Sequence, residues 1–218
     1  QRFSDELLVE EEACFEEIAK AFGENVDAAA GALNAGLRRT QGQVALLAGD
    51  QTFWRRMTAL HADVIAATSV HVVALTATAV DMALDSIGDE LAHCEATLAK
   101  RYEGIAVEGV EHARGLSTDL TSERMLSYAG AQTAGQAAFE ELLSAQVRLA
   151  ASRKEPVEKV AARLLSIDPA NLIGCSGRGI WWRATSGLQA AARGATICLA
   201  NAVRHAAMRG FNDAADAR

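Results

Sequence analysis

The sequence has little proline and few aromatic residues. Only two prolines, Pro156 and Pro169, occur in 218 residues, and aromatic residues make up 5% of the chain. Half of the residues are nevertheless apolar, and 46 of them are alanine. Alanine is the best helix former, since it has no side-chain rotamer entropy to lose. The chain therefore favours an all-α fold of long helices that make close contacts, rather than a core built from aromatic layers.

Long apolar runs, basic charge and N-glycosylation sequons are also missing. No run of 18 apolar residues occurs, so we expect no membrane-spanning segment. The formal net charge is −7, which argues against a nucleic-acid partner, because phosphate binding needs a basic face. No N-x-[ST] sequon is present, and O-linked modification remains open.

Charge is distributed unevenly along the sequence. Residues 1–30 contain nine acidic and two basic residues, whereas residues 178–209 contain five arginines and no acid. Two interpretations fit this pattern. Either these are solvated helix faces with charges matched to helix dipoles, or the two segments dock against each other.

Four cysteines are spread over the chain without a C-x-x-C pair: Cys14, Cys94, Cys175 and Cys198. This spacing disfavours a zinc site or a thioredoxin-like motif. An even number of dispersed cysteines suits two disulfides in an oxidising compartment. The alternative is four reduced thiols in the cytosol. Four cysteines allow three connectivities, and all three stay open.

Hydrophobic periodicity predicts a long antiparallel helical hairpin over residues 5–103. Apolar residues recur every three or four positions along 5–48 and again along 51–103, and Gly49-Asp50 separates the two stretches. Each helix would be roughly 65–80 Å long at 1.5 Å per residue. The glycines of residues 104–120 predict an irregular connection, followed by helices over 121–153, 156–166 and 181–212. Residues 1–218 are thus expected to form one elongated helical-bundle domain with a small irregular end.

The glycine-rich stretch LIGCSGRGIWWRATS (residues 172–186) invites a catalytic interpretation, which it does not support. A nucleophile elbow needs glycine where Arg178 stands, and a phosphate loop needs lysine where Ile180 follows Gly179. We therefore interpret the stretch as a turn that Cys175 tethers and that Trp181 and Trp182 pack onto the bundle. If this region binds a ligand, Arg178, Trp181 and Trp182 would form the binding end.

The histidines do not form a site either. His61 and His71 are about 15 Å apart along one predicted helix, too far to share a metal. His71 falls on the apolar stripe and is expected to be a hydrogen-bonded core histidine. Glu90 and His93 form a single E-x-x-H match, whereas a diiron bundle needs two. The sequence thus predicts no catalytic residue, no metal site and no cofactor, and a protein that is not an enzyme.

The chain resembles the glutamic acid/alanine-rich surface-coat proteins of African trypanosomes, which are related in architecture to the N-terminal domain of the variant surface glycoproteins. The resemblance is carried by the Ala-rich hairpin, by the acidic start SDELLVEEEACFEEIAKAF (residues 4–22) and by the four dispersed cysteines. It implies a coiled-coil-like, disulfide-bonded surface glycoprotein that serves immune evasion in a dense protective coat. It also implies a GPI anchor outside this chain, so that membrane association would be through lipid alone.

Two other functions remain open beside a non-catalytic coat protein. On the same scaffold the chain could be a receptor or binding module for a host protein, using residues 104–120 and 172–183. It could also be an intracellular helical protein of a phage or bacterial assembly. For the coat interpretation the expected partners are neighbouring coat proteins and, as one option, a second copy in a homodimer.

Overall fold

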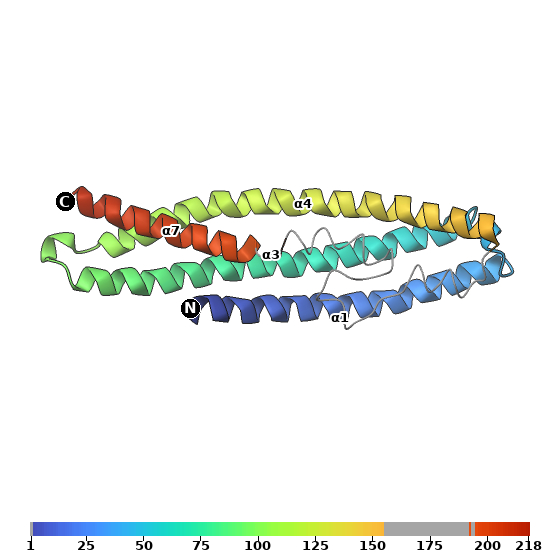
Figure 1. Ribbon diagram of the computed structural model, residues 1–218, viewed down its shortest axis with the longest axis horizontal. Coiled ribbons are helices and arrows are strands. Elements are labelled where there is room, and N and C mark those ends of the chain that lie inside the picture. The colour runs from blue at the N-terminus through green and yellow to red at the C-terminus, as the bar shows by residue number, and fades with distance from the viewer. Residues whose placement is uncertain (1, 155–191, 193–194) are drawn as a thin grey trace. The chain divides into compact units, whose positions relative to one another are not determined.

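Helices make up all the regular structure that the computed structural model describes, which covers residues 2–154, 192 and 195–218 (Figure 1). They are α1 (Arg2–Arg39), α2 (Val44–Leu47), α3 (Gln51–Ala96), the 3-10 turn η1 (Lys100–Tyr102), α4 (Ile105–Arg153) and α7 (Ala195–Asp216). The predicted all-α helical bundle is confirmed. The expected helix 156–166, the stretch 172–186 and the first part of the expected helix 181–212 lie outside the described residues.

The first predicted helix ends nine residues earlier than expected, at Arg39 instead of residue 48. Gln41 and Gly42 adopt positive φ angles of 53° and 74°, and the Gly42 N–H donates to the Leu37 carbonyl at 2.8 Å. A glycine in the left-handed region is a common way to close a helix, because it has no Cβ to clash. The connection to α3 therefore runs through residues 40–50 and includes the single turn α2.

The predicted irregular connection 104–120 is wrong. Instead, α3 ends at Ala96, η1 follows, and α4 begins at Ile105. Gly104, with a φ of 91°, makes the turn, whereas Gly109 and Gly115 lie inside α4. A Cβ on Gly109 would lie only 2.8 Å from the Ala207 carbonyl oxygen of α7. This glycine is thus present because two helices approach closely there, and not because the chain turns.

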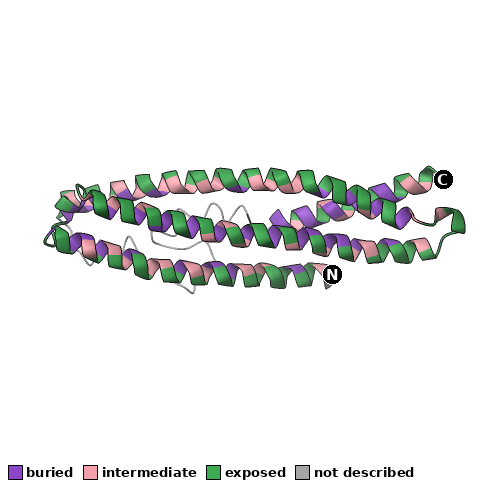
Figure 2. Cartoon of the chain, turned by 180° about the vertical axis from the view of Figure 1, so that it is seen from behind, coloured by how far each residue is buried: buried purple, intermediate pink, exposed green. Residues whose placement is uncertain are grey.

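The chain forms two compact units, each with its own cluster of buried residues. Figure 2 shows buried residues along each of the long helices. Unit 1 comprises Gln1–Cys14, Val72–Ser127 and Ala192–Arg218, and unit 2 comprises Phe15–His71 and Tyr128–Ala191. The helices α1, α3 and α4 each contribute one part to unit 1 and another to unit 2.

In unit 2, the last part of α1 packs against the first part of α3 as the hairpin that periodicity predicts. The Asn25 side-chain amide on α1 donates to the Leu60 carbonyl on α3 at 2.9 Å. The buried cluster joins α1, α2, α3 and α4, with fully enclosed Phe22, Phe53 and Phe139 at its centre. Burying phenylalanine is among the largest apolar contributions that a core can contain.

In unit 1, α7 completes a core made from α1, α3 and α4. This cluster is rich in alanine, including Ala79, Ala83, Ala200 and Ala207. Gly210 of α7 lies so close to α4 that a Cβ there would be 2.7 Å from the His112 Cβ. Small side chains thus set the spacing between helices in this unit, as the alanine content predicts.

Helix α3 is long and apolar enough to cross a membrane, by length and composition alone. This differs from the expectation from sequence, in which the lack of an unbroken apolar run predicted no membrane-spanning helix. Of its most apolar 18-residue window, 44% is buried inside the structure, and a single helix of this kind passes the same test in many bundles without crossing a membrane. The feature is therefore weak evidence for a membrane span.

Candidate functional site

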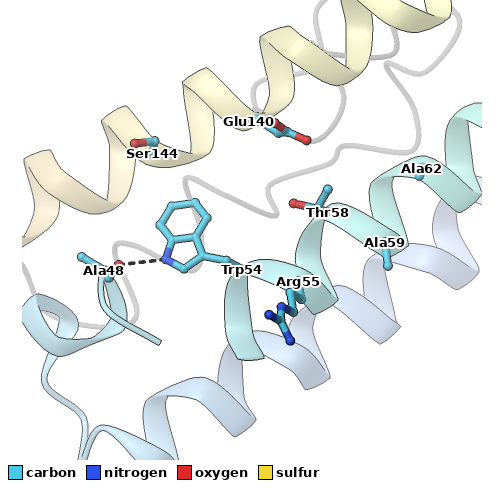
Figure 3. A pocket seen from close by; sticks show the side chains of 8 residues that line it. All are labelled: Ala48, Trp54, Arg55, Thr58, Ala59, Ala62, Glu140 and Ser144. Carbon is cyan, nitrogen blue, oxygen red and sulfur yellow. Dashed lines mark hydrogen bonds between the residues drawn. The ribbon is translucent and has the colours of Figure 1, made fainter. Parts of the chain in front are cut away.

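An open groove lies between α3 and α4 on the described part of unit 2 (Figure 3). Its first section has a volume of about 660 Å³ and the next section along the helices one of about 560 Å³, and both are wide open to the surface. Ala62 and Glu140 line both sections. The groove exists because alanines on the facing sides of the two helices leave room that larger side chains would fill.

Trp54 lies at one end of this groove and is held in a fixed orientation. Its indole N–H donates to the Ala48 carbonyl oxygen at 3.0 Å, the bond drawn in Figure 3. Its ring makes an edge-to-face contact with the buried Phe53, with centroids 5.6 Å apart. Thr58 and Ser144 supply hydroxyl groups beside it. An aromatic ring with a few polar neighbours is one element of small-molecule sites, which are usually deeper than this open groove.

His61 is buried behind the same groove. Its side chain is completely inaccessible to solvent and stacks on Phe139 with centroids 3.9 Å apart and an interplanar angle of 3°. The His61 Nδ1 and Gln136 Oε1 are 2.8 Å apart. The Gln136 amide in turn donates to Glu140 at 3.2 Å. A polar chain therefore leads from the buried imidazole to a carboxylate on the groove.

Burial dominates the electrostatics of this histidine. Desolvation lowers the pKa of His61, and the Gln136 hydrogen bond and the Glu140 charge only partly oppose this. The neutral imidazole is thus the favoured form. Because the Gln136 amide oxygen can only accept, we assign the tautomer in which Nδ1 carries the proton and donates to that oxygen. Because solvent does not reach the ring, the arrangement suits structural hydrogen bonding better than proton transfer to a substrate.

Unit 1 contains a second concave surface of about 770 Å³ where α1, α3 and α7 meet. Arg204 of α7 donates to Ser86 and to Glu90 of α3, each at 2.7 Å, and its guanidinium carbon lies 5.0 Å from the centre of the Phe3 ring. Four carboxylates line this surface: Glu6, Asp85, Asp89 and Glu90. Arg204 thus links three helices and offsets part of this negative charge.

The predicted site residues have different outcomes. Cys175, Arg178, Trp181 and Trp182 lie outside the described residues, so the proposed binding end stays a prediction. Of the other three cysteines, Cys94 and Cys198 are exposed, Cys14 is half-buried, and no disulfide joins any two of them. Each connectivity that four cysteines allow would require one such bond. The structure therefore contains none of the three predicted two-disulfide arrangements.

The core histidine is His61, whereas periodicity predicted His71. His71 is only half-buried. Helix α3 has two buried rows. One runs through Leu60 and Val64, and the other runs through Met57, His61 and Ile65. A search for one narrow stripe misses this second row at spacing four, which a helix contacted from two sides needs. Glu90, from the single E-x-x-H match, pairs with Arg204, and no metal-binding group of three side chains occurs within the described residues.

Comparison with known proteins adds no relative. No protein-family model, no curated protein and no solved structure matches the chain.

Proposed function

We propose that the chain is a non-catalytic structural protein of a cell surface, where it packs beside neighbouring copies in a protective coat. It would lie on the outer face of the plasma membrane, held by a lipid anchor outside this chain. The proposal follows the resemblance of the Ala-rich hairpin and the acidic start to trypanosome coat proteins. That resemblance rests on sequence pattern.

The observation that best supports this role is the continuity of the helices. Helices α1, α3 and α4 run for 38, 46 and 49 residues without a break, so α3 and α4 would each rise by about 70 Å. Each buries apolar residues in the cores of the two units. Long helices with a buried side and a polar side are a suitable element for a layer, because length gives thickness and the outer sides stay free for neighbours.

Labelling of intact cells tests the location. A membrane-impermeant amine-reactive biotin should label the protein in intact cells of the source organism, and a phosphatidylinositol-specific phospholipase should release it. A known cytosolic protein of the same cells is the control that must stay unlabelled. Labelling only after permeabilisation would contradict the surface role and favour the intracellular assembly protein.

A binding module is the second candidate, and the fixed indole of Trp54 favours it. Residues 104–120, one expected binding segment, belong mainly to α4 in unit 1, whereas the α3–α4 groove lies in unit 2. A fragment library screened by ¹⁵N NMR should shift the Trp54 indole signal. A Thr58→Val variant should weaken the same hits, whereas Thr118→Val, which removes an exposed hydroxyl of unit 1, should not. Absence of any shift would contradict this role.

A further inference from the structure

The contact between α3 and α4 in unit 2 is built around one titratable side chain. His61 of α3 is fully enclosed, and its ring lies flat on the ring of Phe139 of α4. Gln136, one turn earlier on α4, bonds to the same imidazole. Two of the groups by which α4 contacts α3 therefore bind His61 directly.

We propose that His61 makes this contact acid-sensitive, so that protonation of the imidazole loosens α4 from α3 in unit 2 at mildly acidic pH. A charged imidazolium is poorly tolerated in an apolar enclosure unless a nearby anion compensates it. Met57, one turn before His61 in the same buried row of α3, and Phe139 belong to the apolar core of the unit.

The charge that acts on His61 from the described residues does not remove this sensitivity. From α4, the Glu140 carboxylate is the charged group that acts on it among the described residues, and Gln136 and Phe139 are neutral. From α1, the Asn25 side chain donates to the carbonyl of Leu60, the residue before His61. Glu140 favours the protonated ring, but it is solvent-exposed and its attraction is screened, so desolvation prevails.

The direction of the effect follows from proton linkage. The pKa of His61 is lower in the folded chain than in the unfolded chain, so unfolded unit 2 binds protons more tightly. The free energy of unfolding of unit 2 is therefore independent of His61 protonation above the ordinary histidine pKa of about 6.5. It decreases as the pH falls from there towards the pKa of His61 in the folded chain. Within this window, the opening constant of unit 2 rises by up to about tenfold per pH unit, as expected for one proton.

Urea unfolding followed by tryptophan fluorescence can test this in the full chain. Replacing Trp181 and Trp182 by phenylalanine leaves Trp54, in unit 2, as the reporter. In that background, His61→Gln removes the titrating group and His205→Gln, an exposed histidine of unit 1, is the matched control. Between pH 8 and pH 5 the parent and His205→Gln should lose stability in parallel, and His61→Gln should lose clearly less.

A second measurement does not depend on whether His61→Gln folds. The ¹³Cε1 shift of His61, followed by NMR in the otherwise unchanged chain, should titrate below pH 6.5. The proposal is overturned if His61 titrates at or above that pH, or if a folded His61→Gln variant retains the full acid dependence of the parent.

Discussion

Two glycines in unit 1 allow α4 and α7 to lie closer together than they could if these residues had a Cβ. A Cβ on Gly109 would lie 2.8 Å from a backbone oxygen of α7, and one on Gly210 would lie 2.7 Å from the His112 Cβ. We predict that Gly109→Ala and Gly210→Ala each destabilise unit 1, by about 1–3 kcal/mol, because the helices must move apart. Urea denaturation followed by circular dichroism measures this.

Gly115 provides the control for these substitutions. It lies in α4 with nothing within 4 Å of the position of a Cβ, so Gly115→Ala gains helix propensity without a clash. It should stabilise the chain by up to about 1 kcal/mol. If all three alanines had the same effect, the close packing of α4 and α7 would not be the reason for Gly109 and Gly210.

The described cysteines should differ strongly in reactivity. Burial, with help from the Glu11 charge, raises the pKa of the Cys14 thiol to about 11, so only roughly a thousandth of it is thiolate at pH 8. Cys94 and Cys198 are exposed. Timed alkylation with iodoacetamide and peptide mass spectrometry should therefore show rapid modification of Cys94 and Cys198 and slow modification of Cys14. Equal rates at all three sites, or a disulfide between two of them, would contradict the structure.

The role of a residue could be predicted from sequence where it depends on the residue's own helix, and not where it depends on a neighbouring helix. The apolar rows through Phe22, Leu33 and Met57 are evident from spacing alone, and these residues are buried. Gly109 was misread because a glycine required by a neighbouring helix looks the same in sequence as a glycine in a turn. His61 was overlooked for a similar reason, since its partners Gln136 and Phe139 lie 75 and 78 residues later on another helix.

At the scale of helices, the ends are determined by specific side chains. Asp50 caps α3: its carboxylate accepts from the Thr52 and Phe53 amides at 3.0 and 3.2 Å and pairs with Arg39 at 2.6 Å. Asp50 and Thr52 are both residue types that favour a helix N-cap, and the structure uses Asp50. The start of α4 was not predictable in this way, because its cap comes from Glu95, near the end of the preceding helix.

Glu95 holds the first turn of α4 through two hydrogen bonds. Its carboxylate oxygens accept from the Gly104 and Ala106 amides at 2.9 and 2.7 Å, and these bonds lower the pKa of Glu95. We predict that Glu95→Ala exposes this turn, so that the Ala106 amide exchanges hydrogen faster in NMR exchange measurements. Glu123→Ala, at an exposed position of α4, is the control and should leave Ala106 protected.

The same bonds give the turn an acid dependence. Because the folded pKa is the lower one, the stabilisation is complete above the ordinary glutamate pKa of about 4.3 and is lost as the pH falls towards the folded value. Protection of Ala106 that did not change below pH 4 would contradict the role of Glu95.

At the scale of the whole chain, the two units differ in charge. Unit 1 contains 17 acidic and nine basic residues, a net formal charge of −8, and unit 2 contains 11 acidic and 12 basic residues, a net charge of +1. Sequence alone placed acids near the start and arginines near the end. It did not assign them to units, because unit 1 is assembled from three separate segments.

This difference predicts an unequal response to salt. Repulsion among like charges destabilises a compact state, and added salt screens it. Raising sodium chloride from 10 mM to 300 mM should therefore slow amide exchange in unit 1 more than in unit 2, as followed by hydrogen-exchange mass spectrometry at constant pH. The same ionic strength reached with another monovalent salt is the control. An equal response in both units would contradict this electrostatic account.

The continuity of α1, α3 and α4 limits how this protein can be dissected. Each of these helices passes from one unit to the other without a loop at the boundary, near residues 14, 71 and 127. A cut at any of these positions would leave a helix end with several backbone groups that have no partner. Fragments made for separate expression should therefore end at 40–50 or 97–104, where the chain already turns, even though neither cut isolates a unit.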